Sequence, residues 1–83
     1  MAQAHGTLLE VSILNPKEAI FEGKAKRVVV PGEEGVFEIL PFHKPIMSRL
    51  LSGTLMVDST SFPVRRGIIK VALNKVTIII ESA

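Results

Sequence analysis

The chain has 83 residues, which suffices for one domain with one hydrophobic core and excludes a second. Apolar residues make up 47% and charged residues 22%, so the composition excludes a disordered chain, and the formal net charge of +2 does not indicate nucleic-acid binding. Cysteine is absent, which excludes a disulfide framework, a thiolate zinc site and a cysteine nucleophile. We therefore expect residues 1–83 to form a single domain, with residues 1–6 flexible.

The spacing of glycine and proline favours strands over helices. Six glycines and five prolines divide the chain into segments that are mostly too short for a helix, which needs at least about 10 uninterrupted residues. Apolar and polar residues alternate within these segments, as where polar residues separate Leu9, Val11 and Ile13. This period of two is typical of a sheet with one buried face.

The expected strands follow in chain order. They cover residues 8–14, 19–22, 25–30, 36–40, 54–58, 62–65, 68–73 and 76–81, with hairpin turns at 59–60 and 74–75. Residues 46–52 (IMSRLLS) also fit a helical turn, but we expect them to be extended. The pattern predicts an all-β fold, a small antiparallel β-sandwich or flattened barrel of about 8 to 10 short strands.

Side chains suited to catalysis or metal binding are few and do not form a known catalytic pattern. His43 and Asp58 could belong to a serine triad, but no serine lies in a nucleophile-elbow sequence. Glu33 and Glu34 are adjacent, and carboxylates in a turn are usually solvated. His5 and His43 are far apart in the sequence, so a metal site would lack ligands. We therefore expect neither an enzyme nor a bound metal or cofactor.

Two small basic clusters leave a binding function open. Lys24, Lys26 and Arg27 form one cluster, and Arg65 and Arg66 form the other, as in a small β-barrel that binds single-stranded nucleic acid. The chain has no Tyr or Trp, however, and its four Phe are scattered, so stacking platforms for bases are missing. We keep this function as the alternative.

The segment that follows the third expected strand is distinctive. Residues 31–45 read PGEEGVFEILPFHKP, in which a glycine-bounded turn leads into a strand and then into Leu-Pro-x-His-x-Pro. This segment resembles the signature of the epsilon subunit of F-type ATP synthase, which is called delta in mitochondria. The resemblance continues at Phe21 and Gly23, at Gly53, from Gly67 to Val71, and from Asn74 to Ile78, so it spans nearly the whole chain.

The resemblance implies a non-catalytic rotor subunit of the central stalk. Such a subunit joins the gamma shaft to the membrane c-ring of a proton- or sodium-driven synthase. It would lie at the cytoplasmic face of the bacterial inner membrane and associate with the membrane only through the complex. Residues implied at the c-ring are Glu33, Glu34, Gly35, Val36 and Phe42. Residues implied at gamma are His43 and Ser48, and those implied to be structural are Gly32, Leu40, Pro41, Pro45 and Gly67.

The chain departs from the family at two of these positions. Family members often have a small residue in place of Phe42, and many have an acidic residue in place of Val36. Charge at the c-ring contact would then come from Glu33 and Glu34. The family's β-sandwich is followed by a C-terminal helical hairpin that can bind ATP, and we expect this chain to lack the hairpin and to bind no ATP by itself.

Overall fold

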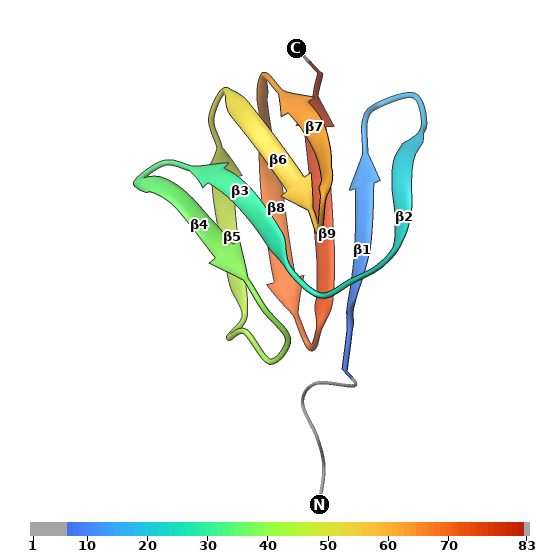
Figure 1. Cartoon of the computed structure of the whole chain (residues 1–83). Helices are drawn as coiled ribbons and strands as arrows, with labels where there is room; N and C mark the ends of the chain where they lie inside the picture. The colour runs from blue at the N-terminus through green and yellow to red at the C-terminus, as the bar shows by residue number, and fades with distance from the viewer. Residues whose placement is uncertain (1–6, 83) are drawn as a thin grey trace, which may run out of the picture.

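The computed structural model describes residues 7–82 and consists of strands and turns (Figure 1). The expected flexibility of residues 1–6 concerns a segment outside the described residues. The strands are β1 (Leu9–Leu14), β2 (Ala19–Ala25), β3 (Val28–Gly32), β4 (Gly35–Ile39), β5 (Ile46–Leu50), β6 (Gly53–Val57), β7 (Thr60–Val64), β8 (Arg66–Ala72) and β9 (Lys75–Glu81). No helix that could cross a membrane is present between residues 7 and 82. The all-β prediction is confirmed.

All nine strands belong to one sheet that curls over itself. The strand order is β2-β1-β9-β8-β5-β3-β6-β7, and β4 pairs with β3 off this path. In Figure 1 the strands β3, β6 and β7 lie across β8 and β9, so the curl makes two layers, as in a sandwich. The pairing is antiparallel except between β1 and β9, which run parallel. The prediction of an antiparallel sheet is therefore wrong for this one pair.

The core lies between the two layers and is entirely apolar. Strand β1 shows the pattern, because Leu9, Val11 and Ile13 are buried while Glu10 between them is exposed. Alternation in the other strands adds residues to the same cluster: Ala25, Val28, Val30, Ile39, Leu50, Leu55, Val57, Val64, Ile69, Val71, Val76, Ile78 and Ile80. None of the described polar or charged residues is buried. Burial of apolar side chains is thus the main source of stability.

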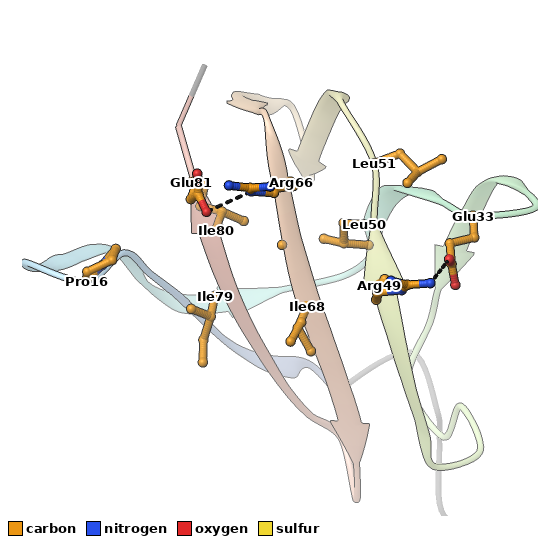
Figure 2. Close-up of a pocket in the computed structure, with 11 residues that line it drawn as sticks. Pro16, Glu33, Arg49, Leu50, Leu51, Arg66, Ile68, Ile79, Ile80 and Glu81 are labelled. Atoms are coloured by element: carbon orange, nitrogen blue, oxygen red, sulfur yellow. Dashed lines mark hydrogen bonds and ion pairs between the residues drawn. The ribbon is translucent and has the colours of Figure 1, made fainter.

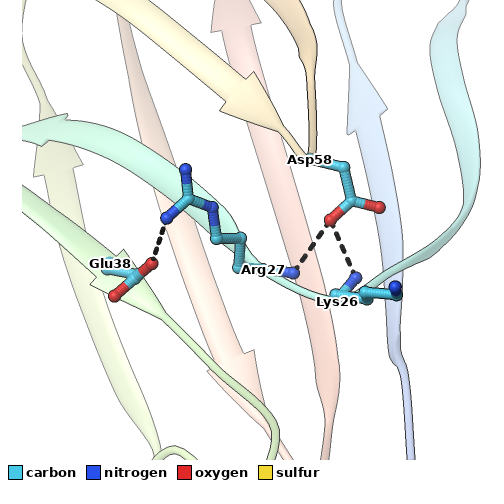
Figure 3. Close-up of polar contacts among 4 residues, drawn as sticks. All are labelled: Lys26, Arg27, Glu38 and Asp58. Atoms are coloured by element: carbon cyan, nitrogen blue, oxygen red, sulfur yellow. Dashed lines mark hydrogen bonds and ion pairs between the residues drawn. The ribbon is translucent and has the colours of Figure 1, made fainter.

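One expected strand is interrupted. Residues 25–30 were expected to be continuous, whereas β2 ends at Ala25 and β3 begins at Val28. Asp58 causes the break, because its Oδ1 accepts hydrogen bonds from the backbone N–H groups of Lys26 (2.9 Å) and Arg27 (3.1 Å) (Figure 3). The N–H of Asp58 donates in turn to the carbonyl of Arg27 at 3.1 Å. These bonds fix the point where the chain crosses between layers.

The other strand and turn boundaries differ from the expected ones by smaller amounts. Gly23 lies inside β2 instead of ending it, and the Phe21 ring is close enough to touch a Cβ placed there. The segment 46–52 is extended over β5, as expected. The structure has the two hairpin turns at 58–59 and 73–74, each one residue earlier in the chain than expected. Leu73, expected in a strand, is therefore a turn residue with φ of 51°.

The two ends of the sheet order, β2 and β7, are not hydrogen-bonded to each other. Phe21 of β2 and Phe62 of β7 meet across this seam, with ring centroids 5.8 Å apart and an interplanar angle of 64°. This edge-to-face geometry is favourable for aromatic pairs. The seam is thus closed by side-chain packing and by the Asp58 hydrogen bonds rather than by a strand ladder.

Candidate interaction surface

The β3–β4 hairpin presents the acidic turn. Gly32 pairs with Gly35, so Glu33 and Glu34 form a two-residue connection. Gly35 has a φ of 121°, a conformation that only glycine adopts without strain. A Cβ at Gly32 would lie 2.6 Å from the Phe37 ring, so the aromatic ring requires glycine there. Both glycines are therefore needed for the shape of the turn.

The two carboxylates of the turn have different surroundings. Glu33 Oε2 lies 2.8 Å from Arg49 Nη2 in an ion pair, which ties the turn to β5 (Figure 2). Glu34 takes part in none of the ion pairs found among residues 7–82. The turn was expected to supply charge through both residues. Of the two carboxylates of the turn, Glu34 is therefore the one without an ion-pair partner among residues 7–82.

The acidic turn borders a shallow hollow. The hollow has a volume of about 400 Å³ and is lined by Glu33, Glu34, Gly35, Val36, Phe37 and Ser48. Val36 is 71% exposed, so an apolar side chain stands next to the free carboxylate. Ser48, which the resemblance implied at gamma, lies here beside the residues implied at the c-ring. Its Oγ donates to the carbonyl of Arg49 at 3.2 Å.

Phe42 and His43 lie apart from this hollow. They follow β4, whereas the acidic turn precedes it, and a five-residue strand separates the two ends by about 17 Å. Residues 40–43 form a turn closed by a hydrogen bond of 3.1 Å from the His43 N–H to the Leu40 carbonyl. His43 Nδ1 donates to the Lys44 carbonyl at 2.7 Å, which fixes the ring within the loop. The structure thus groups Glu33, Glu34, Gly35 and Val36, and places Phe42 elsewhere.

Of the residues implied to be structural, the prolines and glycines have positions with a visible constraint. Pro41 is the second residue of the 40–43 turn, where its fixed φ fits, and the loop ends at Pro45 directly before β5. Leu40 stays half exposed. A Cβ at Gly67 would collide with the carbonyl oxygen of Ile79 on the neighbouring strand, so β8 and β9 approach too closely for a side chain. Gly32 is required by Phe37, as described above.

Sequence reasoning missed a larger groove on the outer face of the sheet. Its volume is about 590 Å³, and Pro16, Leu51, Ile68 and Ile79 contribute apolar surface to it (Figure 2). Two ion pairs flank the groove, the Arg49–Glu33 pair and a pair between Arg66 Nε and Glu81 Oε2 at 2.8 Å. The hydrogen bond from Arg66 lowers the pKa of the Glu81 carboxyl. The sequence did carry a signal for this groove. Ile68 on β8 and Ile79 on β9 are apolar residues at outward-facing positions of adjacent strands.

The basic clusters are partly neutralised. Arg27 Nη1 donates to Glu38 Oε2 at 2.9 Å (Figure 3), and Arg66 is engaged by Glu81. Asp58, the candidate triad acid, is occupied by backbone N–H groups. The described part of the chain holds no group of three or more His, Cys, Asp or Glu residues that could bind a metal ion.

Comparisons with known proteins identify the family of the chain. Residues 8–83 match the family model of the ATP synthase delta/epsilon chain, β-sandwich domain. The ATP synthase epsilon chain of Bordetella avium is 39% identical, over 90% of this chain and 57% of that protein. The ATP synthase epsilon chain 2 of Ralstonia nicotianae is 48% identical, over 60% of this chain and 36% of that protein. The chain thus spans little more than half the length of the Bordetella relative.

Solved structures share the fold. A chain of the Euglena gracilis mitochondrial ATP synthase, OSCP/F1/c-ring, superposes with a TM-score of 0.83 at 18% identity, over 92% of this chain and 52% of that one. A chain of the Tetrahymena thermophila mitochondrial ATP synthase central stalk/c-ring gives 0.79 at 18% identity, over 89% and 63%. These similarities support the fold, and the family match covers nearly the whole sequence. The chain belongs to the ATP synthase delta/epsilon family, as its β-sandwich domain.

Proposed function

We propose that the chain is a non-catalytic rotor component of an F-type ATP synthase, which couples the gamma shaft to the membrane c-ring. The observation that carries this proposal is the family match over residues 8–83, together with curated relatives named as ATP synthase epsilon chains. The assembly would place the chain at the cytoplasmic face of the bacterial inner membrane. The nucleic-acid alternative finds no support in these comparisons.

The fold suits transmission of torque. A coupling element has to keep its shape under load, and protein interiors packed at crystal-like density transmit strain well. The core is continuous through the curled sheet, and the Phe21–Phe62 pair and the Asp58 hydrogen bonds close its seam. The layers therefore resist sliding at the place where no strand ladder holds them.

The acidic turn is the proposed c-ring contact. Glu34 supplies the free negative charge, Val36 the apolar contact, and Gly35 the backbone shape. Glu33 acts through Arg49, because their ion pair holds the turn against β5. His43 and Ser48 are proposed to face gamma. Phe42 is not continuous with the acidic turn, so its assignment to the same c-ring contact needs a second region of contact.

Charge-neutral variants test this division of roles. Rim ion pairs contribute about 0 to 1 kcal/mol and are screened by salt. We expect Glu34→Gln to weaken assembly with gamma and the c-ring by up to fivefold at low salt, and to have little effect at high salt. Glu22→Gln, on the edge strand β2, is the matched control. Glu33→Gln should weaken this assembly less than Glu34→Gln does. Its effect should also depend on salt differently, because Glu33 is proposed to act through Arg49.

The measurement is the affinity of the purified chain for rotor complex from the source membranes, titrated over salt. Failure of the unmodified chain to bind would reject the proposed function. Binding that is insensitive to Glu34→Gln at every salt concentration would reject only the electrostatic role of the turn.

A further inference from the structure

Two turns are joined at the end of the molecule opposite the acidic turn. In Figure 1 the bend after β4 and the β8–β9 turn both lie at the lower end. The side-chain Oδ1 of Asn74, in the β8–β9 turn, accepts a hydrogen bond from the backbone N–H of Phe42 in the bend. The backbone carbonyl of Asn74 also accepts from the N–H of Glu10, near the start of β1, at 2.8 Å. Asn74 therefore ties three segments together. We call the two joined turns, residues 40–43 and 73–74, the tip.

The tip carries two large apolar side chains at positions that do not suit them. Phe42 has a φ of 69° and is the third residue of a turn with proline second, a type II position that favours glycine or asparagine. Leu73 has a φ of 51° in a type I′ pattern, which also favours asparagine or glycine. Phe42 is 66% exposed and Leu73 95% exposed. Neither the turns nor the core requires these side chains, so contact with a partner is the role that remains for them.

Lysine gathers around the tip. Lys70 and Lys75 line a hollow of about 430 Å³ beside Leu73. Five of the six lysines lie at this end of the molecule and are exposed: Lys24, Lys26, Lys44, Lys70 and Lys75.

The acids at the same end are already engaged. Glu38 pairs with Arg27, and Asp58 accepts from the backbone at 26–27. Glu10 lies in register between two of the lysines, one on β2 and one on β9. The chain's excess positive charge is therefore concentrated around the tip. A partner that matches it in chemistry has an apolar recess with acidic side chains at its border.

We infer that the tip is an anchor for gamma, in which Phe42 and Leu73 fill such a recess and Asn74 is the residue that positions them. This inference rests on the proposed function, which places His43 of the same bend at gamma. Side chains buried near the centre of an interface, aromatic ones above all, supply much of its affinity, whereas charges at the rim steer the partner.

Continuity along the chain favours gamma over the c-ring as the partner of the tip. The bend leads directly into β5, which carries Ser48, the second residue proposed to face gamma. The whole length of β4 separates the bend from the acidic turn, which is the proposed c-ring contact. Phe42 is thereby assigned to gamma instead of the c-ring, and Leu73 and Asn74 join it there.

The test separates gamma from the c-ring. Two partners are prepared from the source membranes. One is the soluble catalytic head, which contains gamma but no c-ring and is stripped of its own copy of this chain, and the other is the c-ring in detergent. We expect the 83-residue chain to bind the head with an affinity that falls at least threefold between low and high salt. Binding to the head that does not depend on salt would overturn the acidic border of the recess. Failure to bind either partner would instead reject the proposed function.

Glycine variants remove the apolar contact without straining the turns. Phe42→Gly and Leu73→Gly suit the positive φ of their positions, so the double variant should unfold at a urea concentration similar to that of the unmodified chain. It should bind the head at least tenfold more weakly and the c-ring equally well. Leu51→Ser is the control, because Leu51 is 48% exposed and follows β5 at the opposite end from the bend. Equal binding to the head by the double variant and the control, or a loss confined to the c-ring, would overturn the anchor.

Asn74→Gly tests the positioning role, because glycine suits the φ of 62° but cannot accept the hydrogen bond from Phe42. The urea midpoint should stay close to that of the unmodified chain. The Phe42 amide should exchange with solvent at least tenfold faster, and the affinity for the head should fall at least threefold. Asn74→Asp keeps an acceptor and tolerates the conformation, so at high salt, where its added charge is screened, it should match the unmodified chain. Unchanged affinity of Asn74→Gly, or unchanged exchange at Phe42, would overturn the positioning role.

Discussion

The hydrogen bonds of Asp58 give the sharpest test of the fold. Its carboxylate accepts from the N–H groups of Lys26 and Arg27, and its own φ is 51°. Three substitutions separate these two features. Asn keeps a side-chain acceptor and tolerates the left-handed conformation, Gly keeps only the conformation, and Ala keeps neither.

The expected losses follow from the structure. Each hydrogen bond contributes about 0.5 to 1.5 kcal/mol, because the freed N–H groups can bond to water at this exposed site. Asp58→Gly should therefore lower the free energy of unfolding by about 1 to 3 kcal/mol. Asp58→Ala adds about 1 kcal/mol for the left-handed backbone. Asp58→Asn should lose less than about 1 kcal/mol. A domain of this size has a total stability on the order of 4 to 12 kcal/mol, so the Ala variant is readily distinguished.

Urea unfolding measures these losses, and amide hydrogen exchange locates them. Protection of the Lys26 and Arg27 amides should fall in the Gly and Ala variants before protection of the β8 and β9 core changes. Ser59→Ala, in the same turn, is the control and should remain within about 0.5 kcal/mol of the unmodified chain. This account of the seam would be refuted if Asp58→Ala were more stable than Asp58→Gly. It would also be refuted if amide hydrogen exchange at Lys26 and Arg27 were unchanged in both variants.

Two further predictions concern β8 and β9. Gly67→Ala should lower the free energy of unfolding by about 1 to 3 kcal/mol, because the added Cβ collides with the Ile79 carbonyl, and equal urea midpoints would contradict this. The folded state lowers the pKa of Glu81 through the Arg66 hydrogen bond. Its contribution is therefore complete above the ordinary carboxyl pKa and is lost as pH falls through the folded value, so acidification should lower the urea midpoint of the unmodified chain more than that of Glu81→Gln.

Local pattern was sufficient to predict the type of fold. Strict alternation in segments such as Leu9 to Ile13 permits only one face to be buried, and the glycine and proline spacing leaves most segments too short for a helix. The break at Lys26 and Arg27 could not be predicted, because the acceptor is Asp58, more than thirty residues away in the sequence. The turn at Leu73 was missed for a related reason, since leucine carries no turn signal.

The candidate surface was predictable only where it is contiguous in sequence. The acidic turn from Glu33 to Val36 is one hairpin, so its residues were bound to lie together. Ser48 reaches the same hollow through β5, and Arg49 reaches Glu33 from the same strand. Neither contact has a local signature. Phe42 is near the turn in sequence but is carried away by β4, because an extended strand separates its ends as far as its length allows.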